Sequence, residues 1–313
     1  MGPACRRGQG LTGVNAGRRQ TGMMARRLGF GIRAGSEGLS VVQCASVRSP
    51  PGAPSAFGAA AAAILWLLGA APAGASPAFS APILAYHRFD ARQAGPTTVR
   101  DSTFLAQLDW LERHNYAITP LRTLVDQLTG RAPPPAAPEA AITVDDGHVS
   151  VFTDLFPIIR RRRIPVTLFI YPSAISKASY AMTWVQLGEM QASGLVDIQS
   201  HTYWHPNFRT EKTRRTRADY QTFVAQQLAK SKAVLEARLG RPVTMLAWPY
   251  GIVDADLEAA ARRAGYVAGF DFAGGRAEPA ADPLSTPRIP IGDGDRGAAF
   301  AAALGVKTLR VQP

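Results

Sequence analysis

Two segments of the sequence carry side chains that could form a hydrolytic site. Residues 141–147 (AITVDDG) are an apolar run that ends in Asp145, Asp146 and a glycine. Residues 196–205 (VDIQSHTYWH) are a second apolar run, which ends in His201 and His205. One carboxylate and two imidazoles commonly hold a catalytic zinc ion, because this set leaves one position open for water. The second carboxylate would then be free to act as a general base on that water.

Each segment by itself also has an ordinary structural explanation. Asp-Gly is a common turn after a strand, although two adjacent carboxylates repel each other unless a cation lies nearby. The His-x-x-x-His spacing also fits one core or capping histidine beside an exposed one, and Pro206 favours a strand end and loop there. Together, however, the two segments contain the parts of one metal centre.

The pattern of the chain predicts a parallel sheet with helices between its strands. Apolar runs predict strands, and amphipathic segments predict helices. The strands are expected at 82–87, 141–144, 164–170, 196–199, 244–247, 267–270 and 288–291, and the main helices at 121–128, 151–162, 184–193, 220–239 and 256–264. Six or seven such units predict a closed or nearly closed β/α barrel, whose site lies at the carboxyl ends of its strands.

The N-terminal part differs in composition from the rest. Residues 1–58 are rich in Gly, Arg, Ser and Pro, which predicts a disordered leader or a start codon placed too early. Residues 59–75 combine a short apolar run with Ala-Gly-Ala, as in a secretory signal cleaved near Ala75. We therefore expect a periplasmic or secreted protein with a single catalytic domain at 80–313 and no stable membrane span after cleavage. An uncleaved anchor is the alternative.

Charge and cysteine content limit the function classes. The net charge of +12 falls to +5 after Ala75, where 27 of the 35 basic and 22 of the 23 acidic side chains lie. This mild charge, without a basic helix or an aromatic RNA motif, predicts no nucleic-acid partner. Both cysteines, Cys5 and Cys44, precede Ala75, so the remaining chain has neither disulfides nor a thiolate metal site.

The two segments also carry a family resemblance. TVDDG at 143–147 resembles the TFDDG motif of the polysaccharide deacetylases, which are the NodB-homology enzymes of carbohydrate esterase family 4. HTYWH at 201–205 fits their H-[ST]-x-x-H motif, and the resemblance extends from about residue 82 to residue 291. It implies a deformed (β/α)7 barrel, with Asp145 as general base and Asp146, His201 and His205 as metal ligands. Zinc is the expected metal, and Co²⁺ or Ni²⁺ would also fit.

The sequence departs from the family pattern at two points. The turn at 246–251 (LAWPYG) corresponds to the family's R-x-P-Y-G, but Ala247 replaces the arginine that braces the catalytic Asp. Arg288 is a candidate for that role. The family's late histidine, the general acid, is also missing, because no histidine follows His205. His87 ends the first strand instead, and a circularly permuted arrangement as in the PgaB-like branch would make it the acid. A structural histidine is the alternative.

The resemblance predicts a function and a substrate surface. We expect N-deacetylation of a polysaccharide of N-acetylated sugars, with release of acetate. The side chains expected near the substrate are Tyr203, Trp204, Trp248, Tyr250 and Arg288, although aromatic residues there could equally pack the barrel mouth. Two alternatives stay open, namely a degenerate member that binds glycan without turnover and a deacetylase of a non-polymeric amide or ester.

Overall fold

The computed structural model describes residues 79–279 and 282–306, and the sequence predictions for residues 1–75 lie outside this part. Seven strands form a parallel sheet in the order β10-β1-β5-β6-β7-β8-β9. Their bounds are β1 Ile83–Tyr86, β5 Glu139–Asp146, β6 Val166–Ile170, β7 Val196–Ser200, β8 Met245–Ala247, β9 Ala268–Phe270 and β10 Ile289–Pro290. The short β4, Ala117–Ile118, adds to β5. This order and number of strands confirm the predicted (β/α)7 fold.

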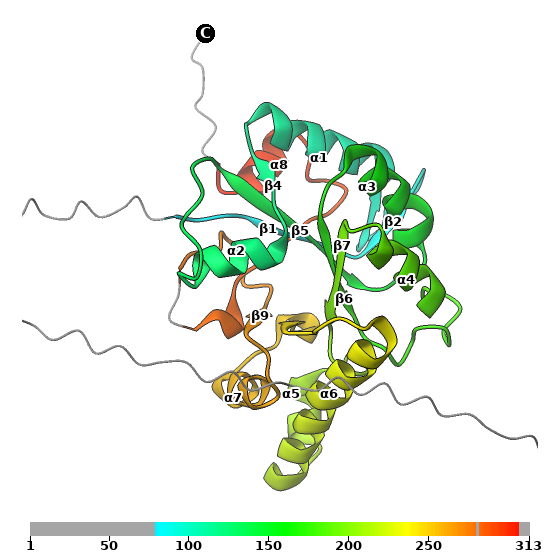
Figure 1. Cartoon of the computed structure of the whole chain (residues 1–313), viewed down its shortest axis with the longest axis vertical. Coiled ribbons are helices and arrows are strands. Elements are labelled where there is room, and N and C mark those ends of the chain that lie inside the picture. The colour runs from blue at the N-terminus through cyan, green and yellow to red at the C-terminus, as the bar shows by residue number, and fades with distance from the viewer. Residues whose placement is uncertain (1–78, 280–281, 307–313) are drawn as a thin grey trace, which may run out of the picture. The chain divides into compact units, whose positions relative to one another are not determined.

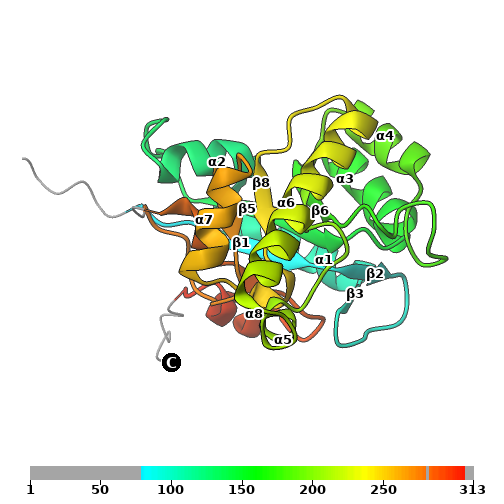
Figure 2. The ribbon, with the colours of Figure 1, turned by 90° about the horizontal axis from the view of Figure 1, so that it is seen from below.

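Helices surround the strands, as Figures 1 and 2 show from two directions. Helices follow strands along the chain because parallel neighbours need a crossover connection. Their bounds are α1 Asp101–Arg113, α2 Leu121–Leu128, α3 Phe156–Arg162, α4 Trp184–Ala192, α5 Phe208–Thr213, α6 Arg217–Leu239, α7 Ala255–Arg263 and α8 Ala298–Ala303. No helix of the described ranges is both long and apolar enough to cross a membrane.

Some helix boundaries differ from those that the sequence predicts. The helix predicted at 151–162 consists of a π-helical turn, Val151–Leu155, followed by α3. Pro157 has no N–H to donate to an earlier carbonyl, which accounts for the change of winding at this point. Helix α6 begins earlier than the predicted residue 220, because Thr216 caps it by accepting a hydrogen bond from Asp219 N at 3.2 Å.

The barrel interior is filled by side chains from alternate strand positions and by α2. One apolar cluster fills the interior. It includes Ile83, Ala141, Phe169 and Phe270 of the strands and Leu124 of α2, and none of these side chains has exposed surface. Because side chains alternate along a strand, the inward position of Ala141 also places Thr143 and Asp145 inward. The apolar interior therefore ends in polar side chains at the carboxyl ends of the strands.

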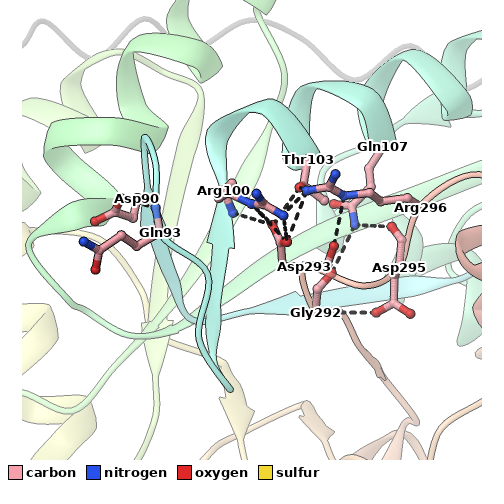
Figure 3. A network of polar contacts seen from close by, with 9 residues as sticks. All are labelled: Asp90, Gln93, Arg100, Thr103, Gln107, Gly292, Asp293, Asp295 and Arg296. Carbon is pink, nitrogen blue, oxygen red and sulfur yellow. Dashed lines mark hydrogen bonds and ion pairs between the residues drawn. The ribbon is translucent and has the colours of Figure 1, made fainter.

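The sheet is open between its edge strands β9 and β10. The chain before β10 narrows this gap, since Thr286 N donates to Gly269 O at 2.8 Å and Asp271 N donates to Thr286 O at 3.0 Å. The segment after β10 is fixed to α1 by polar contacts (Figure 3). There Asp293 accepts hydrogen bonds from Arg100 Nη2 and Thr103 Oγ1, both at 2.6 Å. These contacts hold β10, and the residues that precede it, in place.

Candidate active site

The Asp145-Asp146-Gly147 turn presents two neighbouring carboxylates to one centre. In a regular strand these side chains would face opposite sides of the sheet. Asp146 and Gly147 instead have φ of +74° and +80°, so the chain turns sharply at the end of β5. A Cβ at residue 147 would lie 2.9 Å from Ile170 Cδ1, so glycine meets both the backbone and the packing requirements. The turn is therefore specific to this site rather than a generic Asp-Gly connection.

The two histidines follow β7 in a loop, not a helix. His201 is 1% exposed, and its Nδ1 donates to Ala247 O at 2.8 Å, which leaves Nε2 with a free lone pair. Thr202 and His205 both have positive φ, and Thr202 Oγ1 accepts from His205 N at 3.2 Å. This tight turn brings His205 back beside His201, with ring centroids 4.6 Å apart.

Asp146, His201 and His205 form a set of potential metal ligands. The Nε2 atoms of both histidines lie 3.7 Å from Asp146 Oδ1, and one ligand atom from each residue falls within 4.8 Å of the others. Tetrahedral zinc has ligand distances of about 2.0–2.2 Å, which this spacing can accommodate with small adjustments. Burial lowers the pKa of His201, and burial together with His201 lowers the pKa of His205 to about 4. Both imidazoles are thus neutral near pH 7, the form that binds metals.

Asp145 is held by Arg288, which the sequence suggested as its partner. Arg288 Nη1 donates to Asp145 Oδ1 at 2.8 Å and Nη2 donates to Oδ2 at 2.7 Å, and neither side chain has exposed surface. Phe169 and Phe272 cover the guanidinium, with centroids 5.2 and 4.6 Å from Cζ. Burial is the largest single influence and acts to raise the pKa of Asp145. The charge and hydrogen bonds of Arg288, together with the nearby His201 and His87, outweigh it and hold that pKa well below its usual range.

His87 lies beside this pair at the end of β1. Tyr86 pairs in register with Val144, so the next residues on the two strands are His87 and Asp145. The His87 ring is partly exposed and packs 6.0 Å from the Phe272 ring. First and last strands are neighbours, since β1 pairs with both β5 and β10. His87 thus follows the strand next to β5, and its role as general acid stays a prediction.

Among the aromatic residues expected at the substrate surface, Tyr250 lies beside His205. It is 59% exposed, and its ring is 4.7 Å from that of His205. The Tyr203 ring packs under Lys230 Nζ at 4.0 Å, and Trp204 packs against Phe223 at 6.0 Å, both on α6. Trp204 nevertheless remains 42% exposed.

Two of the predicted substrate contacts are wrong as direct contacts. Trp248 has no exposed surface, and its indole Nε1 donates to Leu284 O at 2.7 Å, so it belongs to the barrel wall. Arg288 is equally buried and reaches Asp145 instead of the surface. In each case the side chain is too deep to touch a sugar.

The site also includes residues that the sequence reasoning did not select. Tyr171 directly follows β6, and its ring lies 5.5 Å from that of His205. Its hydroxyl is 2.9 Å from the hydroxyl of Tyr180. The position of Tyr171 at the end of a predicted strand could have identified it from the sequence. Tyr180 lies ten residues after β6, and only the path of the loop brings it to Tyr171.

Comparison with known proteins agrees with this geometry. Residues 132–269 match the polysaccharide deacetylase family model. The poly-beta-1,6-N-acetyl-D-glucosamine N-deacetylase of Staphylococcus epidermidis is 25% identical over 199 residues, which cover 62% of this chain and 68% of that protein. The protein of the same name from Staphylococcus aureus strain MRSA252 is 25% identical over 202 residues, covering 63% and 68%.

Solved structures share the fold. The deacetylase PplD of Streptococcus pyogenes superposes with a TM-score of 0.65 at 21% identity, covering 72% of this chain and 99% of that one. IcaB of Ammonifex degensii gives a TM-score of 0.64 at 24% identity, covering 72% and 97%. The matched range, 132–269, contains both aspartates, both histidines and the Trp248–Gly251 turn. In this range the chain is similar to the polysaccharide deacetylases, and the relatives named above are N-deacetylases, which are hydrolases of carbon–nitrogen bonds.

Proposed function

We propose that the protein is a metal-dependent hydrolase that removes acetyl groups from a polysaccharide of N-acetylglucosamine. The observation that carries this proposal is the ionised Asp145, braced by Arg288, directly beside the Asp146, His201 and His205 set. His201 Nε2 lies 3.9 Å from Asp145 Oδ2, so the base and the proposed ligands surround the same space. The relatives named above act on poly-beta-1,6-N-acetyl-D-glucosamine, which makes that polymer the first substrate to test.

Asp146, His201 and His205 would hold the metal, with zinc favoured by one carboxylate and two imidazoles. The metal would act as a Lewis acid, polarising the amide carbonyl and lowering the pKa of water in the site. Cobalt and nickel accept the same ligands.

The catalytic work of the chain itself falls to Asp145 and His87. Asp145 would accept a proton from the water while the water oxygen bonds to the amide carbon. It can do so because Arg288 keeps the Asp145 carboxylate ionised and fixes its orientation. When the carbon–nitrogen bond breaks, His87 would donate a proton to the leaving nitrogen. The products are acetate and a free amine on the sugar.

Arg288 also bears on the alternative of a glycan-binding protein without turnover. The reason to consider that alternative was the missing motif arginine at Ala247. Ala247 has no exposed side-chain surface, and its carbonyl orients His201. Because the Arg288 guanidinium reaches Asp145 instead, the proposed base has an arginine partner even without the motif arginine. This arrangement favours an enzyme.

Acetate release is the direct test of the proposal. The protein would be stripped of metal with a chelator and given β-1,6- and β-1,4-linked N-acetylglucosamine oligomers, with and without added zinc. We expect zinc-dependent acetate, faster with the β-1,6 oligomers. The Asp145→Asn variant, which keeps the size of the side chain, serves as the inactive control. If zinc-loaded protein released no acetate from any N-acetylated glycan, the proposal would be wrong.

Export, with cleavage near Ala75, is a separate proposal that N-terminal sequencing of the mature protein tests.

A further inference from the structure

Exposed aromatic side chains collect around the candidate site. Within the described residues, the large apolar side chains with substantial exposure are Tyr180, Val185, Trp204, Tyr250 and Val267. Three of them, Tyr180, Trp204 and Tyr250, lie on the loops that follow β6, β7 and β8. Single exposed apolar residues are normal on any protein, so position and local contacts must decide whether one has a function.

The Tyr180 ring is held in place although the residue is 43% exposed. Its hydroxyl is 2.9 Å from the Tyr171 hydroxyl, and its ring lies nearly parallel to the His148 ring, at 11° and 6.3 Å. An exposed side chain usually keeps its rotational freedom and loses it on binding a ligand. The contacts of Tyr180 have already removed much of that freedom.

The Tyr180 loop is also joined to the catalytic turn. Val149 N donates to Tyr180 O at 2.7 Å, and Met182 N donates to Gly147 O at 2.9 Å. The position of the Tyr180 ring is therefore coupled to the turn that carries Asp145 and Asp146.

Aromatic rings stand on both sides of the histidine loop. Tyr171 follows β6 and Tyr250 follows β8, and β7, which leads to His205, lies between these strands. Their rings lie 5.5 and 4.7 Å from the His205 ring. Tyr180 extends the β6 side of this row through its hydroxyl contact with Tyr171. A small amide would need one such surface, whereas a polymer crosses the site and meets both.

We infer that Tyr180 binds the sugar next to the one that is deacetylated, on the β6 side, with Tyr250 serving the β8 side. The apolar C–H face of a pyranose ring packs on an aromatic face, and the paired hydroxyls of Tyr171 and Tyr180 can hydrogen-bond to sugar hydroxyls. This arrangement makes the protein act within a chain rather than on single sugars. The inference rests on the proposed function and deepens it.

Substrate length distinguishes this role from a structural one. Acetate release would be measured on a β-1,6-linked hexamer and on the N-acetylglucosamine monosaccharide, which has no neighbouring sugar, with wild type, Tyr180→Ala and Tyr180→Phe. For Tyr180→Ala we expect KM for the hexamer to rise about 5- to 20-fold with kcat unchanged, and KM for the monosaccharide to change less than about twofold. Tyr180→Phe keeps the ring but loses the hydroxyl that contacts Tyr171, so its KM for the hexamer should rise less than that of Tyr180→Ala. Val185→Ala, at another exposed apolar residue, is the matched control and should not alter either KM.

Two outcomes would overturn the inference. One is an unchanged KM for the hexamer in Tyr180→Ala. The other is an equal loss on the hexamer and the monosaccharide, which would indicate a distorted site. A binding assay tests the inference without turnover. Calorimetry would measure the affinity for the hexamer in two inactive variants, Asp145→Asn and Asp145→Asn/Tyr180→Ala. Weaker binding of the double variant supports the inference even if wild type released no acetate, and equal binding contradicts it.

Discussion

Arg288 and Asp145 form a two-point ion pair across 143 positions of sequence, with both side chains fully buried. The guanidinium comes from the residue before β10, and the carboxylate from the penultimate residue of β5. Between these strands lies β1, so the pair crosses the barrel interior and does not join neighbouring strands. It fixes the direction of the proposed base and supplies the positive charge that the Ala247 position lacks.

Removing Arg288 should affect both folding and catalysis. Arg288→Met would leave a buried carboxylate without its partner, and we expect a loss of about 3–5 kcal/mol in the free energy of unfolding. Asp145→Asn/Arg288→Met removes both charges and should recover part of that loss. Denaturant unfolding of wild type, both single variants and the double variant gives the coupling energy. A coupling energy near zero would show that the Asp145–Arg288 ion pair does not stabilise the fold.

Metal binding should stabilise the folded protein through the three proposed ligands. At zinc concentrations about 100-fold above Kd, the expected gain is about 2.7 kcal/mol, visible as a rise in Tm of chelator-treated protein. Asp146→Asn and His205→Ala should each reduce this rise strongly. His148→Ala is the control, since His148 lies outside the ligand set, and should keep the rise. An equal rise in Tm for all variants would place the metal elsewhere.

The proposed acid role of His87 predicts a dependence on the leaving group. His87→Gln should lower kcat on the amide substrate by about 10²–10⁴, because a departing amine needs a proton. Hydrolysis of p-nitrophenyl acetate, whose leaving group departs without protonation, should fall much less. Rates on both substrates, compared between wild type and variant, check this. Equal losses would indicate that His87 acts through structure.

Gly269 is required for packing of the barrel wall. A Cβ there would lie 2.3 Å from Leu284 O and 2.8 Å from Trp248 Nε1, the two atoms of the hydrogen bond that holds the indole. Gly269→Ala should therefore destabilise the fold by about 1–3 kcal/mol. A Cβ on Gly188, in α4, would meet no atom within 4 Å, so Gly188→Ala should be neutral or stabilising by up to about 1 kcal/mol. Denaturant unfolding of the two variants tests the contrast.

The Asp293 contacts predict a pH-dependent part of stability. Hydrogen bonds from Arg100 and Thr103 hold the pKa of Asp293 well below its usual range. This stabilisation is complete above the unfolded pKa of about 4 and is lost as pH falls towards the lower native pKa. Asp293→Asn should cost about 1–2 kcal/mol at pH 7, moderated by the 37% exposure of Arg100.

The difference between wild type and Asp293→Asn should shrink below about pH 4. Unfolding of both proteins at pH 7, 5 and 3 measures it. Asp126→Asn, which breaks the exposed pair with Arg131, is the control and should cost less than about 0.5 kcal/mol. A difference that stays constant down to pH 3 would contradict the assigned pKa of Asp293.

The local sequence determined the alternation of strands and helices, and with it the parallel barrel. Apolar runs such as 166–170 can be buried on both faces only in such a sheet, so their pattern was readable without coordinates. The ends of these runs identified Asp145, Asp146, His201 and His205 as the candidate centre. Side-chain type and strand position were sufficient there, because parallel strands end at a common edge.

Only the tertiary structure decided which side chains meet. Arg288, Tyr171 and Tyr180 join the site through strand order and loop course, and no short-range pattern in the sequence pairs them with their partners. The depth of Trp248 likewise depends on the close approach of Leu284 to Gly269. The positive φ values at the ends of β5 and of the histidine loop aim their side chains in ways that strand periodicity does not predict. Residue type thus specified the chemistry, while long-range packing specified its geometry.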